Sequence, residues 1–211
     1  EAKLFEIETR TPSLANFDTK FNVKKHKVYF GIKDIKSLTG KTGERVVDSI
    51  KMSEQELKKP MKKFTWLEIL LFFAPKISST AFKALASIGF FRDFNGRVSR
   101  NKAMYDYDIY RTLTKAEQTW IQSNYNDKKW NDFIDCLKSL APTKKEGGGT
   151  SKVARKQIVE NEIQLLIDPP YELEDDPSWI VDQETRFLGC PVTLNKVDTA
   201  DKSAANTTCK D

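Results

Sequence analysis

Histidine and paired cysteines are almost missing from this chain of 211 residues. His26 is the single histidine, and an HExxH helix or a zinc site built on histidines needs more than one. The three cysteines (Cys136, Cys190 and Cys209) are odd in number and have no CxxC spacing. Neither a disulfide framework nor a cysteine metal site is therefore expected, and the cysteine usage fits a reducing cytoplasm.

Long apolar runs and nucleotide-binding glycine motifs are also lacking. The longest apolar run covers residues 66–74 and contains Glu68, whereas a helix needs about 20 apolar residues to cross a bilayer. The glycines at 147–149 do not belong to a GxxxxGK[ST] motif, so no P-loop is predicted. We expect no membrane partner. Because the chain begins with Glu1, in the middle of a pattern, we interpret it as a piece of a longer protein.

What the chain has in quantity is positive charge, and that charge is unevenly spread. Residues 1–115 contain 23 Lys and Arg against 13 Asp and Glu, whereas residues 116–211 contain 12 against 17. A basic surface favours a polyanion such as nucleic acid as the partner of the first part. A lysine-rich surface that only keeps the protein in solution is the alternative.

The spacing of apolar residues predicts a mainly α-helical chain that starts with an extended segment. Residues 17–23 and 27–30 are expected to pair as a small β-hairpin. Local signals mark several helix ends: Thr65 and Pro177 at starts, Pro75 and Gly189 at ends, and a capping box at 53–56 that opens a further turn. Helices are predicted over residues 32–38, 44–52, 66–74, 80–88, 99–112, 114–123, 128–140, 152–167 and 178–188.

The stretch 31–94 contains two units of helix, tight polar turn and helix. Such tandem helix–hairpin–helix units present backbone N–H groups at the start of the second helix of each unit, where an anion is favoured. A nucleic-acid phosphate is the natural ligand. The residues predicted to bind phosphates are Lys36, Thr39, Gly40, Lys41, Thr42, Gly43, Lys76, Ser78, Ser79 and Thr80, with Lys83, Arg97 and Arg100 as helpers.

Other stretches have two interpretations at this stage. The hydroxyl groups of the second turn either contact a phosphate or act only as helix caps. The basic run 58–63 is either a solvated loop or a further phosphate contact, and the glycine-rich residues 142–151 form a loop. The aromatic run 90–94 and the large aromatic residues of 114–140 favour a core position over a surface for stacking bases.

Three sequence motifs, in the order in which they occur along the chain, resemble motifs of the alpha subunit of DNA polymerase III, a bacterial family C replicative polymerase. Residues 12–36 include Pro-Ser and end in Tyr-Phe-Gly-Ile-Lys-Asp-Ile-Lys; residues 76–94 read Lys-Ile-Ser-Ser-Thr-Ala-Phe-Lys-Ala-Leu-Ala-Ser-Ile-Gly-Phe-Phe-Arg-Asp-Phe; residues 182–191 include Glu-Thr-Arg-Phe-Leu-Gly. They are similar to the family's tandem hairpins and to the pattern before its OB-fold. The altered residues in these motifs suit a phage-encoded or otherwise diverged member of this polymerase family. The chain departs from the family at 37–43, where the family has Gly-Val-Gly.

The resemblance implies a division of the chain and a role for it. Residues 1–30 would end the fingers, 31–115 would form the tandem helix–hairpin–helix DNA-binding domain, 116–192 a helical extension, and 193–211 a polar tail or linker. The family's Mg²⁺-binding palm carboxylates would lie before Glu1, so no cofactor and no polymerase activity are expected of this chain alone. The implied location is the cytoplasm of a bacterial or phage-infected bacterial cell.

The function predicted is sequence-independent binding of duplex DNA during replication. The alternative is a protein-interaction module whose C-terminal helices, with Trp120, Trp130 and Trp179, bind a sliding clamp or another replisome protein. The segment Gln164-Leu-Leu-Ile-Asp168 lacks the aromatic end of a clamp-binding pentapeptide and is interpreted as helix. A helical scaffold without a ligand is the third possibility.

Overall fold

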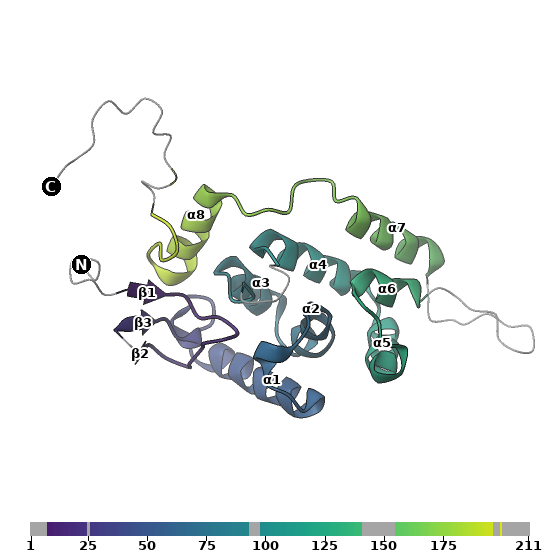
Figure 1. Cartoon of the computed structure of the whole chain (residues 1–211), viewed down its shortest axis with the longest axis horizontal. Coiled ribbons are helices and arrows are strands. Elements are labelled where there is room, and N and C mark those ends of the chain that lie inside the picture. Colours follow the sequence, from purple (N-terminus) through teal and green to yellow (C-terminus); the bar gives the residue numbers. More distant parts are fainter. Residues whose placement is uncertain (1–7, 25, 93–97, 141–154, 196–198, 200–211) are drawn as a thin grey trace, which may run out of the picture.

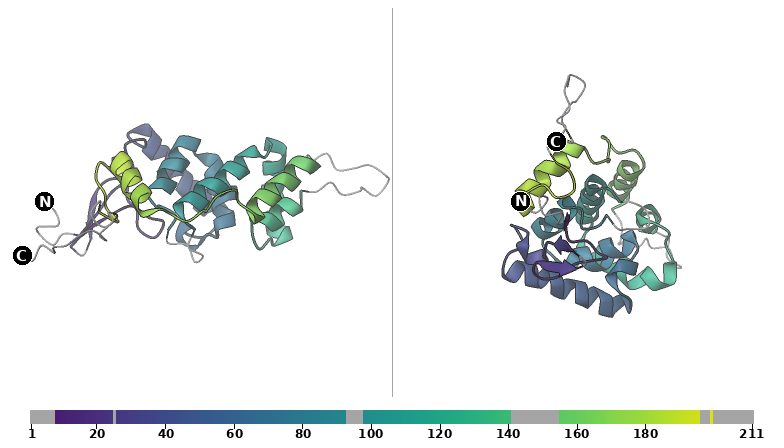
Figure 2. Two further views of the ribbon diagram at one scale, coloured as in Figure 1. Left: turned by 90° about the horizontal axis from the view of Figure 1, so that it is seen from above. Right: turned by 60° about the vertical axis from the view of Figure 1, so that its left-hand side comes forward.

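The computed structural model describes residues 8–24, 26–92, 98–140, 155–195 and 199. Helices dominate, and a small sheet lies near the N-terminus, which confirms the predicted mainly α class (Figure 1). The sheet and α8 lie at one end of the molecule and α5, α6 and α7 at the other (Figure 2). The strands are β1 (Glu8–Arg10), β2 (Asn22–Lys24) and β3 (Lys27–Tyr29).

The helical elements follow in one run along the chain. The first group is η2 (Ile32–Asp34), α1 (Lys41–Leu57), η3 (Met61–Lys63), α2 (Trp66–Glu68), η4 (Ile69–Phe73), η5 (Ala74–Lys76) and α3 (Ser79–Ser87). The second group is α4 (Arg100–Thr112), α5 (Lys115–Lys128), α6 (Phe133–Lys138), α7 (Lys156–Ile167) and α8 (Pro177–Leu188).

The predicted hairpin between 17–23 and 27–30 is present, but it is only part of the sheet. Strand β2 pairs antiparallel with β3, with Val23 opposite Val28. Strand β1 lies on the other side of β3 and runs parallel to it, with Thr9 also opposite Val28. A parallel pairing depends on contacts between residues distant in sequence, so local patterns did not indicate β1.

The prediction of a helix over 32–38 is wrong, although the spacing of apolar residues in this stretch correctly identified the buried side chains. Ile32, Ile35 and Leu38 have no exposed surface. Only Ile32–Asp34 is helical, as a 3₁₀ turn, because the Asp34 carboxylate accepts a hydrogen bond from the Gly31 amide (2.9 Å) and Ile35 is already extended. The tight turn therefore replaces a regular helix.

Helix α1 is longer than predicted at both ends. It begins at Lys41 rather than at 44 and continues to Leu57 without a break at Ser53. The predicted capping box at 53–56 is wrong because the Ser53 hydroxyl is buried and donates to the carbonyl oxygens of Ser49 (2.8 Å) and Phe72 (2.9 Å). The hydroxyl thereby joins α1 to the helix of the second hairpin.

The helix predicted over 66–74 starts at Trp66 as expected, but it changes type along its length and its last turn runs past Pro75 to Lys76. Thr65 caps it in a capping box with Glu68, and the chain then passes through a π-helix (η4) into a 3₁₀ turn (η5). Pro75 has no N–H to donate to the carbonyl of Leu71, four residues earlier. The Gln122 side chain from α5 supplies that hydrogen bond instead (2.5 Å).

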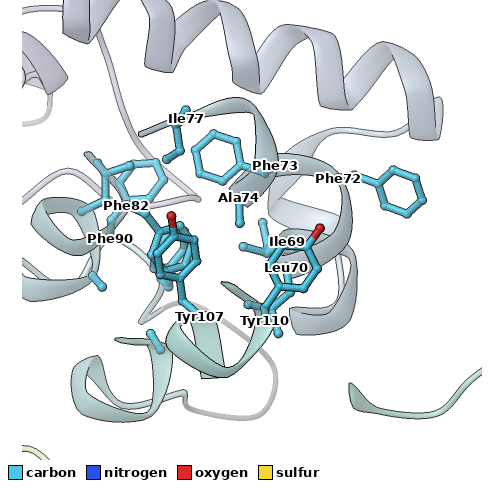
Figure 3. Packing of buried hydrophobic residues seen from close by; sticks show 14 of the residues in the cluster. Ile69, Leu70, Phe72, Phe73, Ala74, Ile77, Phe82, Phe90, Tyr107 and Tyr110 are labelled. Atoms are coloured by element: carbon cyan, nitrogen blue, oxygen red, sulfur yellow. The ribbon is translucent and has the colours of Figure 1, made fainter. Parts of the chain in front are cut away.

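Aromatic side chains form the centre of the core between η4, α3 and α4 (Figure 3). The Phe82 ring stacks on Tyr107 with centroids 4.0 Å apart, and on Phe91 at 5.0 Å. Phe90 and Phe91 are buried, which confirms the core interpretation of the aromatic run for these two residues, whereas Phe94 lies outside the described residues.

The later helices follow their capping signals. Helix α5 extends past the predicted end to Lys128, and α6 begins at Phe133 rather than at 128, because Asp132 caps it. Helix α8 begins at Pro177 and ends at Gly189, which has the predicted left-handed conformation (φ 84°). Arg155, just before α7, pairs with the buried Glu117 of α5 (3.1 Å) and fixes the start of α7.

Candidate nucleic-acid interface

The first predicted turn forms the exposed start of α1. Gly40 has φ 59° and ψ −131°, a conformation for which glycine is strongly favoured, and no side chain accepts a hydrogen bond from the first turn of α1. In contrast, α2, α3, α4, α5, α6 and α8 each begin with a Ser, Thr or Asp side chain that caps the helix. Thr39, Gly40, Lys41 and Thr42 are all exposed. The positive end of a helix of 17 residues is therefore open to an anion.

Gly43 is buried and acts in the site through packing. A Cβ atom at this position would lie 2.3 Å from the carbonyl oxygen of Leu38 and 2.8 Å from the Lys33 side chain. The two sides of the turn approach so closely that only glycine fits. Gly43 thus holds the turn in shape and does not itself offer a surface, in contrast to the predicted contact role.

We expect Gly43→Ala to lower the free energy of unfolding by about 1–3 kcal/mol, because the added methyl group must displace backbone atoms. Urea unfolding followed by circular dichroism measures the change. Thr42→Ala, at the exposed neighbouring position, is the control and is expected to change the stability by less than about 0.5 kcal/mol. Equal effects of the two substitutions on stability would contradict the close approach of Gly43 to the Leu38 carbonyl and the Lys33 side chain.

Positive side chains without carboxylate partners precede and follow this turn along the chain. Lys36, Lys41 and Arg45 are exposed, and none of them forms an ion pair with any described residue. Arg186, also without an ion pair there, lies on α8 next to Phe187, whose carbonyl accepts from the Lys36 amide (2.9 Å). Its guanidinium lies over the Phe187 ring, 5.2 Å from the ring centroid. We call Lys36, Lys41, Arg45 and Arg186, together with the amides of the turn, the first-turn site.

Two of these residues were missed by the sequence analysis. Arg45 lies four residues after Lys41, and this spacing places both on one face of α1, so the signal was present. Arg186 lies some 150 positions further along the chain, and only the packing of α8 brings it to the turn. Lys33, next to the turn, is neutralised by Glu44 (2.5 Å).

Most polar side chains at the second predicted turn form hydrogen bonds or ion pairs within the protein. The Ser78 hydroxyl caps α3 by accepting from the Ala81 amide (3.2 Å), so the cap interpretation of this hydroxyl holds. The Lys76 ammonium group donates to Glu56 (2.7 Å) and to the Phe72 carbonyl, and the Lys83 ammonium group pairs with Asp108 (2.8 Å). Ser79 is half-buried and Thr80 exposed in the first turn of α3.

The two turns border the same helix. The Ser49 hydroxyl in α1 donates to the Lys76 carbonyl (3.2 Å), so the second turn lies against the middle of α1. At 1.5 Å per residue, Ser49 lies about 12 Å along the axis from the start of α1 at Lys41. Helix α1 is therefore the element that positions both turns.

Arg100 does not fit its predicted role as a helper, and Arg97 lies outside the described residues. The Arg100 side chain is only 6% exposed and its guanidinium donates to the Glu184 carboxylate (2.8 Å) and to the Ser87 carbonyl (2.7 Å). Glu184 in turn accepts from the amides of Val192 and Thr193, both at 2.7 Å. A phosphate has no access to this guanidinium, so the pair has a structural role.

The Glu184 carboxylate is held in its charged form by these partners. Burial alone raises its pKa, but the hydrogen bonds from Thr193, Arg100 and Val192 outweigh burial and bring the pKa below the ordinary value. The charged pair links α4 to α8, next to Gly89, where a Cβ atom would lie 3.2 Å from the guanidinium.

No family model, curated protein or solved structure matches this chain. Among the residues that the structure describes, no cluster of three or more His, Cys, Asp or Glu side chains is arranged to bind a metal ion. None of the helices in that part of the chain has the length and apolar character needed to span a membrane. The geometry and charge of the first-turn site are therefore the features from which a function can be inferred.

Proposed function

We propose that this chain binds the sugar–phosphate backbone of duplex DNA without sequence preference, as part of a replication protein like the alpha subunit of DNA polymerase III. The observation that carries the proposal is the uncapped start of α1 at a glycine turn, with Lys41 and Arg45 exposed on its first turns and without an ion-pair partner among the described residues. The partner is double-stranded DNA in the cytoplasm of a bacterial or phage-infected cell.

The chemistry of the site suits phosphate groups. The amides of the first turn of α1 donate to one phosphate, whose charge the helix dipole stabilises. Lys36, Lys41, Arg45 and Arg186 lie where they can contact neighbouring phosphates. Contacts to phosphates position a protein on DNA but do not distinguish bases, so the binding is independent of sequence.

The second turn supports the first through α1. Its carbonyl at Lys76 accepts from Ser49, and its lysines are neutralised by Glu56 and Asp108, so its net attraction for phosphates is small. The exposed Thr80 hydroxyl group contacts a DNA phosphate only where the first turn has already positioned the duplex.

The double variant Lys41→Glu plus Arg45→Glu tests this function. We expect duplex binding to weaken at least tenfold, because two attractions become repulsions. The slope of log K against log salt is expected to decrease in magnitude by about 1.8, or about 0.9 per lost phosphate contact. Fluorescence anisotropy of a labelled 20-base-pair duplex at several salt concentrations measures both quantities.

The matched control reverses two exposed lysines far from the turn, Lys138→Glu plus Lys156→Glu on α6 and α7. This variant has the same net charge and is expected to retain most of the affinity. An equal loss in both variants would mean that only net charge matters. Full binding by Lys41→Glu plus Arg45→Glu would reject the first-turn site.

A protein-interaction module is the second candidate, and exposed apolar residues on α7 favour it. Ile158 is 40% exposed and Ile167 59%, on a helix of the less basic part of the chain. A sliding clamp or another replisome protein would be the partner. If neither duplex nor single-stranded DNA binds the wild-type chain in the anisotropy measurements, this candidate is favoured.

A further inference from the structure

We infer that a second surface of this chain, separate from the first-turn site, binds single-stranded nucleic acid. It is formed by the loop after α1 and by the C-terminal part of α5 with the residues that follow. We call it the loop–α5 surface. Its members are Lys58, Lys62, Lys63, Trp120, Tyr125, Lys128, Lys129 and Trp130.

The buried Glu68 carboxylate joins the two parts of this surface. One of its oxygens binds the Lys59 ammonium group (2.6 Å), and the other accepts from the Thr65 amide (2.7 Å). The Tyr125 ring of α5 packs against Phe72, in the same helical stretch as Glu68, with ring centroids 5.2 Å apart. Burial together with the Glu68 carboxylate raises the pKa of Tyr125 to about 12. Residues 58–65 and the end of α5 are therefore parts of one surface.

Five lysines give this surface a strong positive charge. Lys58, Lys62, Lys63, Lys128 and Lys129 are exposed, and none of them has an ion-pair partner among the described residues. Most other lysines in the described ranges, such as Lys59 here, are paired with carboxylates. Exposed ammonium groups that stay unpaired are available to phosphates, which they bind as point charges.

Acidic groups near this surface do not cancel its charge. Glu54 lines a hollow with Lys58 and Lys59, but its carboxylate accepts from the Met61 amide (2.7 Å). Asp127 is exposed and precedes Lys128 and Lys129 in the chain. The charge of the unpaired lysines therefore exceeds that of the nearby carboxylates.

Aromatic rings lie beside these lysines. The Trp130 ring has its centroid 6.2 Å from Trp120 and 6.5 Å from Tyr125, and Tyr125 rests on Phe72 of the core at 5.2 Å. Trp120, Tyr125 and Trp130 remain only half-buried. The cluster is thus anchored from below by the core and keeps aromatic surface toward the solvent.

Lysines together with partly exposed aromatic rings match the chemistry of a single strand. Bases of a single strand stack on aromatic side chains while the phosphates contact positive groups, without a requirement for sequence. A duplex hides the faces of its bases, and an acidic protein segment would use the charge but not the rings. A single strand is therefore the ligand that uses both features of the surface.

The distance from the first-turn site allows the two surfaces to be tested separately. Lys41 and Leu57 are the two ends of α1, and 1.5 Å per residue places them about 24 Å apart. The first-turn site borders the start of α1, and the loop–α5 surface follows its end. Substitutions at one surface therefore leave the other unchanged.

The experiment measures binding of a fluorescently labelled dT20 strand to the full chain by anisotropy at several salt concentrations. We expect Lys62→Gln plus Lys128→Gln to weaken binding and to reduce the magnitude of the salt slope by about 1.4, or about 0.7 per phosphate contact. Trp130→Ala is expected to weaken binding at least fivefold, whereas Trp130→Phe, which keeps an aromatic ring, retains most of the affinity. Wild-type tryptophan fluorescence is expected to fall when unlabelled dT20 binds.

Lys138→Gln plus Lys156→Gln is the charge-matched control and is expected to bind dT20 like the wild type. Lys41→Glu plus Arg45→Glu should lose duplex binding but retain dT20 binding, so failure of one site is distinguishable from failure of the other. Equal losses in the test and control variants, or unchanged binding by Trp130→Ala, would overturn the inference. Binding of duplex alone, or of neither nucleic acid, would also overturn it.

Discussion

Glu184→Gln is expected to lower the free energy of unfolding by about 3–5 kcal/mol. The substitution keeps the shape of the side chain but removes the nearer of the two carboxylates that balance the buried Arg100 guanidinium, and leaves Asp175 at 4.0 Å. A buried charge that loses its closest partner retains much of the cost of its removal from water. Urea unfolding followed by circular dichroism measures the loss, and thermal unfolding should show a melting temperature lower by about 10 °C.

The effect should depend on pH with a definite sign. The pKa of Glu184 in the folded chain lies below the ordinary value of 4.5, so its stabilising contribution is complete above that value. As the pH falls through the lower pKa of the folded state, the carboxylate takes up a proton and the contribution disappears. The difference in stability between wild type and Glu184→Gln should therefore shrink below about pH 4.5.

Two further variants separate the pair from a general effect of charge. Asp182→Asn removes a charge from an exposed position of the same helix and is expected to change stability by less than about 0.5 kcal/mol. Arg100→Met plus Glu184→Leu removes both charges and should recover much of the lost stability. A loss below about 1 kcal/mol for Glu184→Gln would show that the pair is solvated.

Phe82→Ala is expected to lower the free energy of unfolding by a similar amount, about 3–5 kcal/mol. Phe82 has no exposed surface and stacks between Tyr107 and Phe91, with Trp66 at 6.5 Å. Removal of the ring loses its burial and leaves a cavity between η4, α3 and α4, which the surrounding helices can close only in part. The urea midpoint should fall without a change in the slope of the transition.

Phe82→Leu and Lys83→Ala are the controls for this prediction. Leucine fills much of the space and should cost clearly less than alanine. Lys83, next to Phe82, forms a solvent-exposed ion pair with Asp108, and its truncation is expected to cost less than about 1 kcal/mol. Equal costs for Phe82→Ala and Phe82→Leu would mean that stacking of the ring, and not the filled volume, dominates.

The buried Arg100 changes how the C-terminal part of the chain is understood. Through Arg100 and Glu184, α8 is fixed to α4, and through Phe187 it is fixed to the first hairpin at Lys36. The acidic C-terminal residues therefore do not all form a separate unit. Helix α8 instead lies against the segment that precedes the first turn, through the hydrogen bond from the Lys36 amide to the Phe187 carbonyl, and Arg186 is the residue before Phe187.

Local signals predicted the parts of the fold that depend on neighbouring residues. Thr65, Pro177 and Gly189 mark helix ends because these signals act within three or four positions. The apolar spacing also identified Ile32, Ile35 and Leu38 as buried, although not their conformation. The spacing of apolar residues indicates which side chains face the core. It does not distinguish an α-helix from a short 3₁₀ turn, because both place residues three positions apart on the same side.

Within the candidate site, the first turn could be predicted and most of its surroundings could not. Gly40 and Gly43 stand out in the sequence because glycine is favoured in such turns. The ion pairs of Lys76 and Lys83 and the burial of Arg100 join residues 20 to 84 positions apart, so no local pattern indicates which cations stay free. Charge counts alone treat all of these residues as equal.

The sequence by itself determined the mainly α class, most helix positions and the glycine turn before α1, because capping, periodicity and glycine conformation act within a few residues. Only the tertiary structure decided which positive groups remain unpaired at the surface. The reason is physical: the partner of a charged side chain is chosen by the packing of helices distant in sequence. Pairing removed Lys76 and Arg100 from the predicted set, and the packing of α8 against Lys36 added the unpaired Arg186.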